Sequence, residues 1–97
     1  MRQDIEEILI KILNENNYMT SADNHSLVVY KILQSFNNKD QKPLAKKIKY
    51  IARIELYRNE ICIFSSRSQA KIEYSDLTTN KILEIIETYE RTRPNYT

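Results

Sequence analysis

The sequence contains no glycine, no tryptophan, one cysteine, one histidine and two prolines. Without glycine there is neither a P-loop nor a dinucleotide-binding fingerprint, because both need glycines where the backbone approaches a phosphate. Asn and Asp then become the side chains best able to adopt a positive φ. We therefore expect two asparagine groups to form helix C-caps and a third site to form a hairpin turn at positive φ. These are Asn14, Asn16 and Asn17, then Asn37 and Asn38, and finally Asn59.

The scarcity of Cys and His limits the chemistry that the chain can perform. Cys62 cannot form an internal disulfide or a zinc site of several thiolates, which suits a reducing compartment. It lies inside the apolar run 61–64 and is interpreted as a small buried hydrophobe, not as a nucleophile. No further ligands stand at metal-binding spacing from His25. We expect no catalytic residue, no metal and no cofactor.

Long apolar runs are also missing. No run approaches the ~18 residues that a membrane span needs, and residues 1–7 are acidic before their apolar residues, unlike a secretory signal. The 97 residues are 41% hydrophobic and 29% charged, with a net charge of +2. These values are typical of one small globular domain with a single core. The sequence predicts a cytoplasmic protein.

The first half of the chain predicts two helices. Apolar residues at helical spacing mark a helix over 3–16 (Ile5, Ile8, Leu9, Ile12 and Leu13). A second set after the cap signal at Thr20 marks a helix up to Phe36 (Leu27, Val29, Ile32, Leu33 and Phe36). The β-leaning residues Val28, Val29 and Tyr30 leave a strand open as an alternative for this second segment.

The second half predicts a sheet. A polar connector over 38–43 precedes the sheet. In residues 44–57, near-strict alternation of apolar and polar residues indicates a helical or irregular start followed by a long strand. A helix that begins at Pro43 also fits the apolar spacing of this segment. The apolar run 61–64 predicts a strand covered on both faces, and alternation over 70–74 predicts another. Residues 58–60 and 65–69 are the expected turns.

The last element has the clearest local signals. Thr78 is a natural N-cap, Leu77 before it can form a hydrophobic staple with Ile82, and Pro94 ends a helix over 79–92. The fold class is therefore α+β. We expect a single domain, 1–97, in the order α-α-β-β-β-α, with a three-stranded antiparallel meander covered by helices on one face. Residues 1–37 form its helical half, 44–93 form the sheet and last helix, and 94–97 form a loose tail.

One stretch is unusually basic. Six cations occur with Asp40 as the sole acid among them: Lys39, Lys42, Lys46, Lys47, Lys49 and Arg53. Strict alternation places part of this set on one sheet face with an apolar residue and an aromatic ring, which suits a macromolecular partner. The candidate partner-binding residues are Lys47, Lys49, Ile51, Arg53, Tyr57 and Lys71. The alternative is a solvated lysine-rich face that only prevents aggregation.

We consider three functions. The first is a non-enzymatic interaction or regulatory protein that binds a protein, including a second copy of itself, through an open sheet face or an edge strand. The Ile, Asn and Lys richness matches AT-rich coding, so a phage- or plasmid-type inhibitor or immunity protein fits. The second is a nucleic-acid-binding protein, using the basic face or a winged-helix arrangement with a recognition helix over 43–53.

The third is a toxin-type ribonuclease, in which Arg, Lys and Tyr on a sheet cleave RNA by charge stabilisation and positioning. The predicted order of elements is loosely similar to that of RelE-like toxins. Their usual first strand is missing here, and no motif matches.

Overall fold

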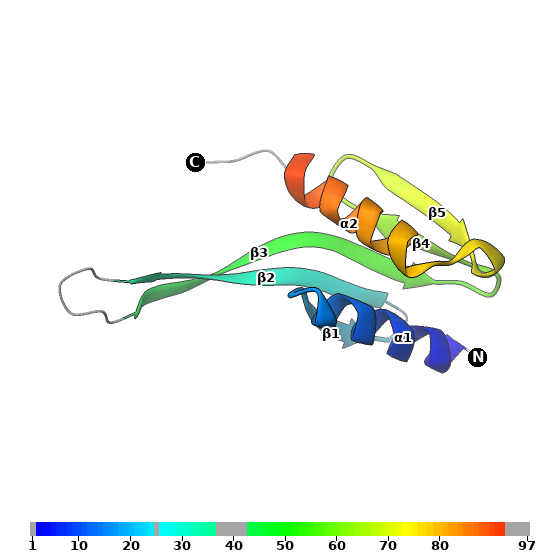
Figure 1. Cartoon of the computed structure of the whole chain (residues 1–97), viewed down its shortest axis with the longest axis horizontal. Helices are drawn as coiled ribbons and strands as arrows, with labels where there is room; N and C mark the ends of the chain where they lie inside the picture. Colours follow the sequence, from blue (N-terminus) through cyan, green and yellow to red (C-terminus); the bar gives the residue numbers. More distant parts are fainter. Residues whose placement is uncertain (1, 25, 37–42, 93–97) are drawn as a thin grey trace.

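The computed structural model describes residues 2–24, 26–36 and 43–92 and shows an α+β fold. Its five strands form one antiparallel sheet in the order β1-β2-β3-β4-β5, so each strand pairs with its neighbour in sequence (Figure 1). A short 3-10 turn, Tyr74–Asp76, precedes the last helix. The elements are α1 (Arg2–Glu15), β1 (Met19–Asp23), β2 (Ser26–Phe36), β3 (Pro43–Leu56), β4 (Glu60–Phe64), β5 (Gln69–Glu73) and α2 (Thr79–Thr92).

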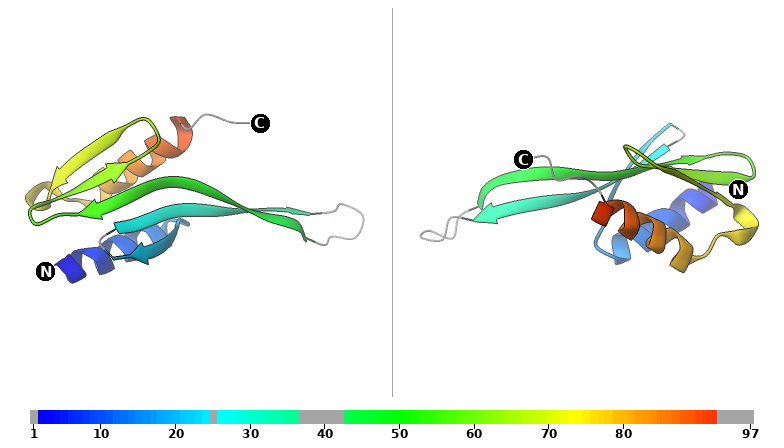
Figure 2. Two further views of the ribbon diagram at one scale, coloured as in Figure 1. Left: turned by 180° about the vertical axis from the view of Figure 1, so that it is seen from behind. Right: turned by 90° about the horizontal axis from the view of Figure 1, so that it is seen from above.

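Both helices lie on the same side of the sheet, and none of the elements that the structure describes lies on the other side (Figure 2). Buried residues from the helices and from the covered sheet face form a single core cluster. Its fully buried members include Leu9, Leu13, Leu27, Ile54, Ile61, Ile63, Ile82 and Ile86. A two-layer arrangement of this kind covers one sheet face and leaves the opposite face to solvent or to a partner.

The helix predicted over 20–36 is wrong, because this segment forms β1 and β2. Apolar residues are so frequent in this segment that some of them recur at helical spacing by coincidence, although the backbone is extended. Leu27 and Val29 are fully buried under the helices, whereas Val28 and Tyr30 alternate with them toward the other face. The β-branched pair Val28 and Val29 favours this extended backbone. The sheet therefore has five strands instead of three, and the first half holds one helix.

The structure of the second half agrees better with the prediction from the sequence. Residues 43–56 are strand throughout, so the helical start at Pro43 and the winged-helix arrangement are both wrong. The β4 and β5 strands and the two turns lie where they were predicted, and Cys62 and Ile63 on opposite faces of β4 are both buried. The predicted connector spans the gap between β2 and β3. Its residues 38–42 lie outside the described residues, as do His25, Asn37, Pro94 and the tail.

The helix α1 ends in a Schellman motif built on asparagine. The backbone N–H of Tyr18 donates to the carbonyl of Leu13 over 2.9 Å, and that of Asn17 donates to Asn14 over 3.2 Å. Asn17 has φ 71°, the one positive φ among the described non-glycine residues. The C-cap expected here is confirmed. The positive φ expected at Asn59 is wrong, although that residue does lie in the β3–β4 turn.

The conformation of Asn17 gives a stability prediction. We expect Asn17→Gly to be neutral or to stabilise the protein, and Asn17→Val to cost about 1–2 kcal/mol, because a β-branched residue is strained at positive φ. Asn59→Val should cost less than Asn17→Val. Urea denaturation followed by circular dichroism measures both, and equal midpoints for the Gly and Val variants at position 17 would contradict the motif.

The helix α2 has the predicted bounds and the predicted cap. The Thr78 hydroxyl accepts a hydrogen bond from the backbone N–H of Lys81 over 3.1 Å. Leu77 packs against the core to which Ile82 and Ile86 belong. Within the described part of the chain, no helix combines the length and apolar character required to cross a bilayer.

Candidate interaction surface

The uncovered side of the sheet, called the open face below, is defined by strand alternation and register. Leu27, Val29 and Ile54 point into the core, so their neighbours along the strands point the other way. Cross-strand pairing then arranges the open face in rows. From the end near the β3–β4 turn they are Glu60–Glu73, Asp23–Ser26–Glu55–Cys62–Lys71, Ser21–Val28–Arg53–Phe64–Gln69, Met19–Tyr30–Tyr50 and Ile32–Ile48.

A β-bulge in β3 changes which residues reach the open face. Val29 pairs with Ala52 and Tyr30 pairs with Tyr50, so Ile51 has no partner in β2. A bulge places two residues opposite one and interrupts the alternation. Ile51 and Ala52 are consequently both buried, at 3% and 8% exposure. Every residue of β3 before the bulge lies on the face opposite to the one that strict alternation predicts.

The bulge separates the six candidate residues. Arg53 and Lys71 lie on the open face, and Tyr57 lies beside it, where its hydroxyl donates to the Glu55 carboxylate. Lys47 and Lys49 lie on the helix side, since Lys49 pairs with Lys31 and acts electrostatically on Glu90 of α2. Ile51 is in the core. The structure therefore does not bring these six residues together on one face.

The open face instead carries an apolar patch that the sequence did not indicate. We call Met19, Val28, Tyr30, Ile32, Ile48 and Tyr50 the open-face patch. Ile48 is 55% exposed, Tyr50 is 54% exposed, and Met19 and Ile32 are each 43% exposed. The rings of Tyr30 and Tyr50 lie 6.4 Å apart in a tilted arrangement. Four large apolar side chains exposed on one uncovered surface are typical of a contact site.

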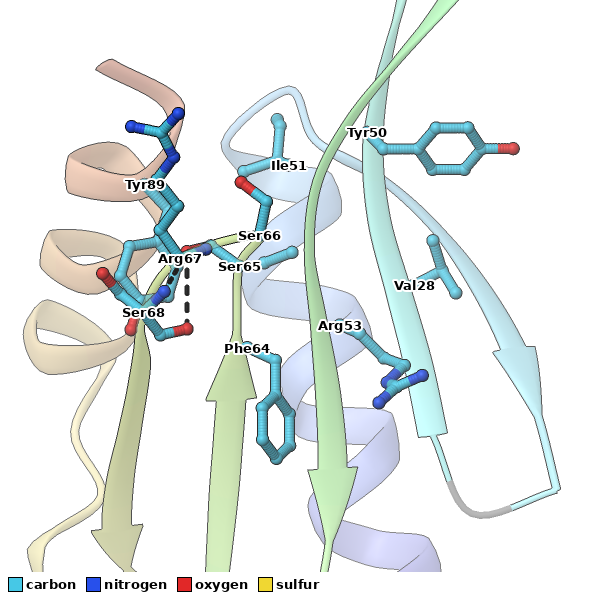
Figure 3. A pocket seen from close by; sticks show the side chains of 11 residues that line it. Val28, Tyr50, Ile51, Arg53, Phe64, Ser65, Ser66, Arg67, Ser68 and Tyr89 are labelled. Atoms are coloured by element: carbon cyan, nitrogen blue, oxygen red, sulfur yellow. Dashed lines mark hydrogen bonds between the residues drawn. The ribbon is translucent and has the colours of Figure 1, made fainter. Parts of the chain in front are cut away.

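The patch is hollowed on both sides of Tyr50. A depression of about 270 Å³ is lined by Ser21, Val28, Tyr30, Ile48 and Tyr50. A second depression, of about 370 Å³, lies beyond the end of β4, where β3 continues without a paired strand on that side (Figure 3). Figure 3 shows Tyr50, Val28 and Arg53 around it, with the Ser65–Ser68 turn on the other side. Arg53 is held there by an ion pair with Glu55 of 2.9 Å and by the Phe64 ring.

Beyond these rows, β2 and β3 continue as a two-stranded arm, defined as Lys31–Phe36 and Pro43–Tyr50 (Figure 1). Neither β1 nor β4 pairs with this part. The arm contains four lysines and no acidic residue, whereas the chain outside residues 31–50, called the body below, has nine Lys and Arg against twelve Asp and Glu. The arm is therefore basic and the body is acidic.

Three side chains attach the base of the arm to the helical layer. The Tyr18 hydroxyl donates to Glu90 over 2.8 Å, Lys31 forms an ion pair with the same carboxylate over 2.9 Å, and the Lys31 ammonium lies 4.7 Å from the centre of the Tyr18 ring. Burial raises the pKa of the Glu90 carboxyl, but the hydrogen bonds from Lys31 and Tyr18 and the charges of Lys31 and Lys49 outweigh burial and lower the pKa.

The lowered pKa of Glu90 makes the stability depend on pH. Its contribution is present above the pKa of the unfolded carboxyl, about 4.3, and is lost as the pH falls through the lower pKa of the folded state. We expect Glu90→Gln to cost up to about 1 kcal/mol at pH 7 and to match wild type in acid. Glu84→Gln, at an exposed position of α2, is the control. Denaturation midpoints measured from pH 7 to pH 3 test this, and a constant gap between variant and wild type would contradict it.

The surroundings of Cys62 disfavour its reactive thiolate form. Burial, followed by the nearby Glu60 carboxylate, raises the pKa of the Cys62 thiol, which keeps it protonated. Its Sγ lies 3.8 Å from the Glu60 carboxylate. Within the described ranges no three His, Cys, Asp or Glu side chains group as metal ligands would. No family model matches the chain, and neither a curated protein nor a solved structure shows significant similarity to it.

Proposed function

We propose that the protein is a non-enzymatic interaction module that binds a protein partner through its open face. This proposal is carried by the exposure of Ile48, Tyr50, Ile32 and Met19 on a surface that no described element covers. Removing these side chains from water is favourable at about 25 cal/mol per Å² of apolar surface. Aromatic residues and Met are also enriched at the centres of protein interfaces.

The shape of the surface favours a macromolecule over a small ligand. Small-molecule sites are concave and enclose most of the ligand. The depressions beside Tyr50 are instead open to solvent, and the larger one extends past the sheet to Tyr89 of α2. A regulatory protein that acts by occupying its target, such as an inhibitor or immunity protein, needs a surface of this kind and no reacting group. For the ribonuclease alternative, Arg53 and Tyr57 are already engaged by Glu55.

Affinity capture with matched variants tests the proposal. The baits are wild type, Ile48→Asp on the open face, and Ile8→Asp on α1, where Ile8 is 52% exposed on the helix side. We expect wild type and Ile8→Asp to recover the same proteins and Ile48→Asp to lose them. Recovery of the same proteins by Ile48→Asp would contradict the proposal. Thermal melts of the two variants confirm that both remain folded.

The four lysines of the arm, which are Lys31, Lys46, Lys47 and Lys49, support a second candidate, nucleic-acid binding by the arm. A two-stranded β-ribbon fits the major groove of DNA, and phosphate contacts make the affinity fall log-linearly with salt. Lys47→Glu with Lys49→Glu should abolish binding to duplex DNA or RNA in a fluorescence anisotropy titration. Arg53→Glu, on the opposite face, is the control. An affinity that does not change with salt would contradict this candidate.

A further inference from the structure

The outer edge of β3 is unpaired over most of its length. Within the described part of the chain, β4 pairs with β3 only from Arg53 to Leu56, because the chain turns away after Phe64. The remainder of this edge, residues 43–52, is called the free edge below, and Figure 1 shows β3 extending there beyond β4 and α2. We propose that the free edge binds an extended segment of another protein as an added strand, in which acidic and apolar residues alternate.

The backbone of the free edge and the hollow beside it favour a strand as the occupant. An unpaired edge presents a row of N–H and C=O groups to which an incoming chain hydrogen-bonds. The free edge is longer than β1, β4 or β5. The depression of about 370 Å³ lies where β4 would continue, between residues 50–53 of β3 and the Ser65–Ser68 turn (Figure 3). At this end, the position of the missing strand is therefore open to solvent.

The side chains beside the free edge select the sequence of the added strand. Lys47 and Lys49 lie on the helix side, and neither forms an ion pair within the described residues. Ile48 and Tyr50 alternate with them on the open face and are 55% and 54% exposed. Opposite charges or apolar side chains that stand opposite each other on neighbouring strands stabilise the pairing. A strand of alternating acidic and apolar residues places its carboxylates beside the lysines and its apolar side chains beside Ile48 and Tyr50.

The same lysines disfavour the free edge of a second copy as the occupant. Pairing of the two edges would bring lysines beside lysines, and like charges opposite each other destabilise a sheet. Lysine is a common residue on edge strands for this reason, and a charge that rejects a like edge also selects a strand of opposite charge. The outer edge of β2, over Lys31–Phe36, offers less, because its one cation, Lys31, is already paired with Glu90 over 2.9 Å.

A fluorescein-labelled peptide of alternating Glu and Val, about ten residues long so that it spans the free edge, tests the proposal by fluorescence anisotropy. We expect the full-length wild type to bind it with a dissociation constant below about 100 µM, and a shuffled peptide of the same composition to bind at least about tenfold more weakly. Lys47→Glu with Lys49→Glu should lose the Glu–Val peptide and bind a Lys–Val peptide instead. Lys71→Glu, on β5, is the control and should bind as wild type does. Thermal melts establish that the variants are folded.

Backbone methylation of the peptide separates strand pairing from simple charge attraction. Methyl groups on the nitrogens of every second residue remove the N–H donors from one edge of the peptide strand only. One of the two alternate sets should abolish binding, and the other should preserve it. No binding of the Glu–Val peptide by wild type, equal binding of the shuffled peptide, or binding of both methylated peptides overturns the inference. Binding of duplex DNA through Lys47 and Lys49 without binding of the peptide also overturns it.

The free edge adjoins the open face, but its test is separate from that of the proposed function. A protein that does not bind the Glu–Val peptide, yet captures a partner that is lost on Ile48→Asp, overturns the added strand and leaves the open face as a binding surface. Conversely, alternation-dependent peptide binding supports the added strand even where Ile48→Asp captures the same proteins as wild type. That second result overturns only the open-face proposal.

Discussion

Replacing Ile51 with aspartate is expected to destabilise the protein by at least about 3 kcal/mol, because the bulge places this side chain in the core and a buried carboxylate has no partner there. That is a large fraction of the total for a domain of this size, so we expect the variant to be mostly unfolded at 37 °C. Urea denaturation and circular dichroism measure the effect.

The matched control for Ile51→Asp is Ile48→Asp, three residues earlier in the same strand. Ile48 is 55% exposed on the open face, so aspartate there should cost no more than about 1 kcal/mol. The two variants differ only in which face of β3 receives the charge. Similar midpoints for both would mean that the bulge lies elsewhere and that the rows of the open face are misassigned.

Truncating Ile54 to alanine is expected to cost about 2–5 kcal/mol, because it removes a fully buried side chain from the centre of the sheet and leaves a cavity beneath the helices. Ile54 pairs with Leu27 in β2 and Ile63 in β4, all three fully buried. Ile32→Ala, at a half-exposed position of the neighbouring strand, should cost less than about 1 kcal/mol. A small effect at Ile54 would contradict the packing of the helices on this face.

The sequence predicted those elements whose local signals have one interpretation. The helices α1 and α2 combine helical spacing with caps at Asn17 and Thr78, and the structure places both within a residue of the predicted bounds. The β2 strand was missed because Val29, Ile32, Leu33 and Phe36 recur at helical spacing, while apolar residues on both faces of the strand hide its alternation. Only pairing with β3 decides between the two, and pairing is a long-range property that periodicity does not report.

The candidate surface was predicted less well, for two physical reasons. Lys47, Lys49 and Arg53 were placed on one face by strict alternation, and the bulge at Ile51 reverses the alternation between them. A bulge depends on cross-strand register, which one strand does not specify. Tyr30 and Ile32 were assigned to a helix, so their position beside Tyr50 and Ile48 could not be anticipated. The expectation of an open sheet face as the binding surface remains a proposal.

Oxidative footprinting of the open face tests the central proposal most directly. Hydroxyl radicals modify exposed Met and Tyr side chains, and mass spectrometry locates the modified residues. Dilute purified protein is compared with the complex recovered by affinity capture. We predict that Met19, Tyr30 and Tyr50 are protected in the associated state, while Ile8 on the outer surface of α1 reacts equally in both. Unchanged reactivity at Met19 and Tyr50 in the associated state would show that the open face is not the binding surface.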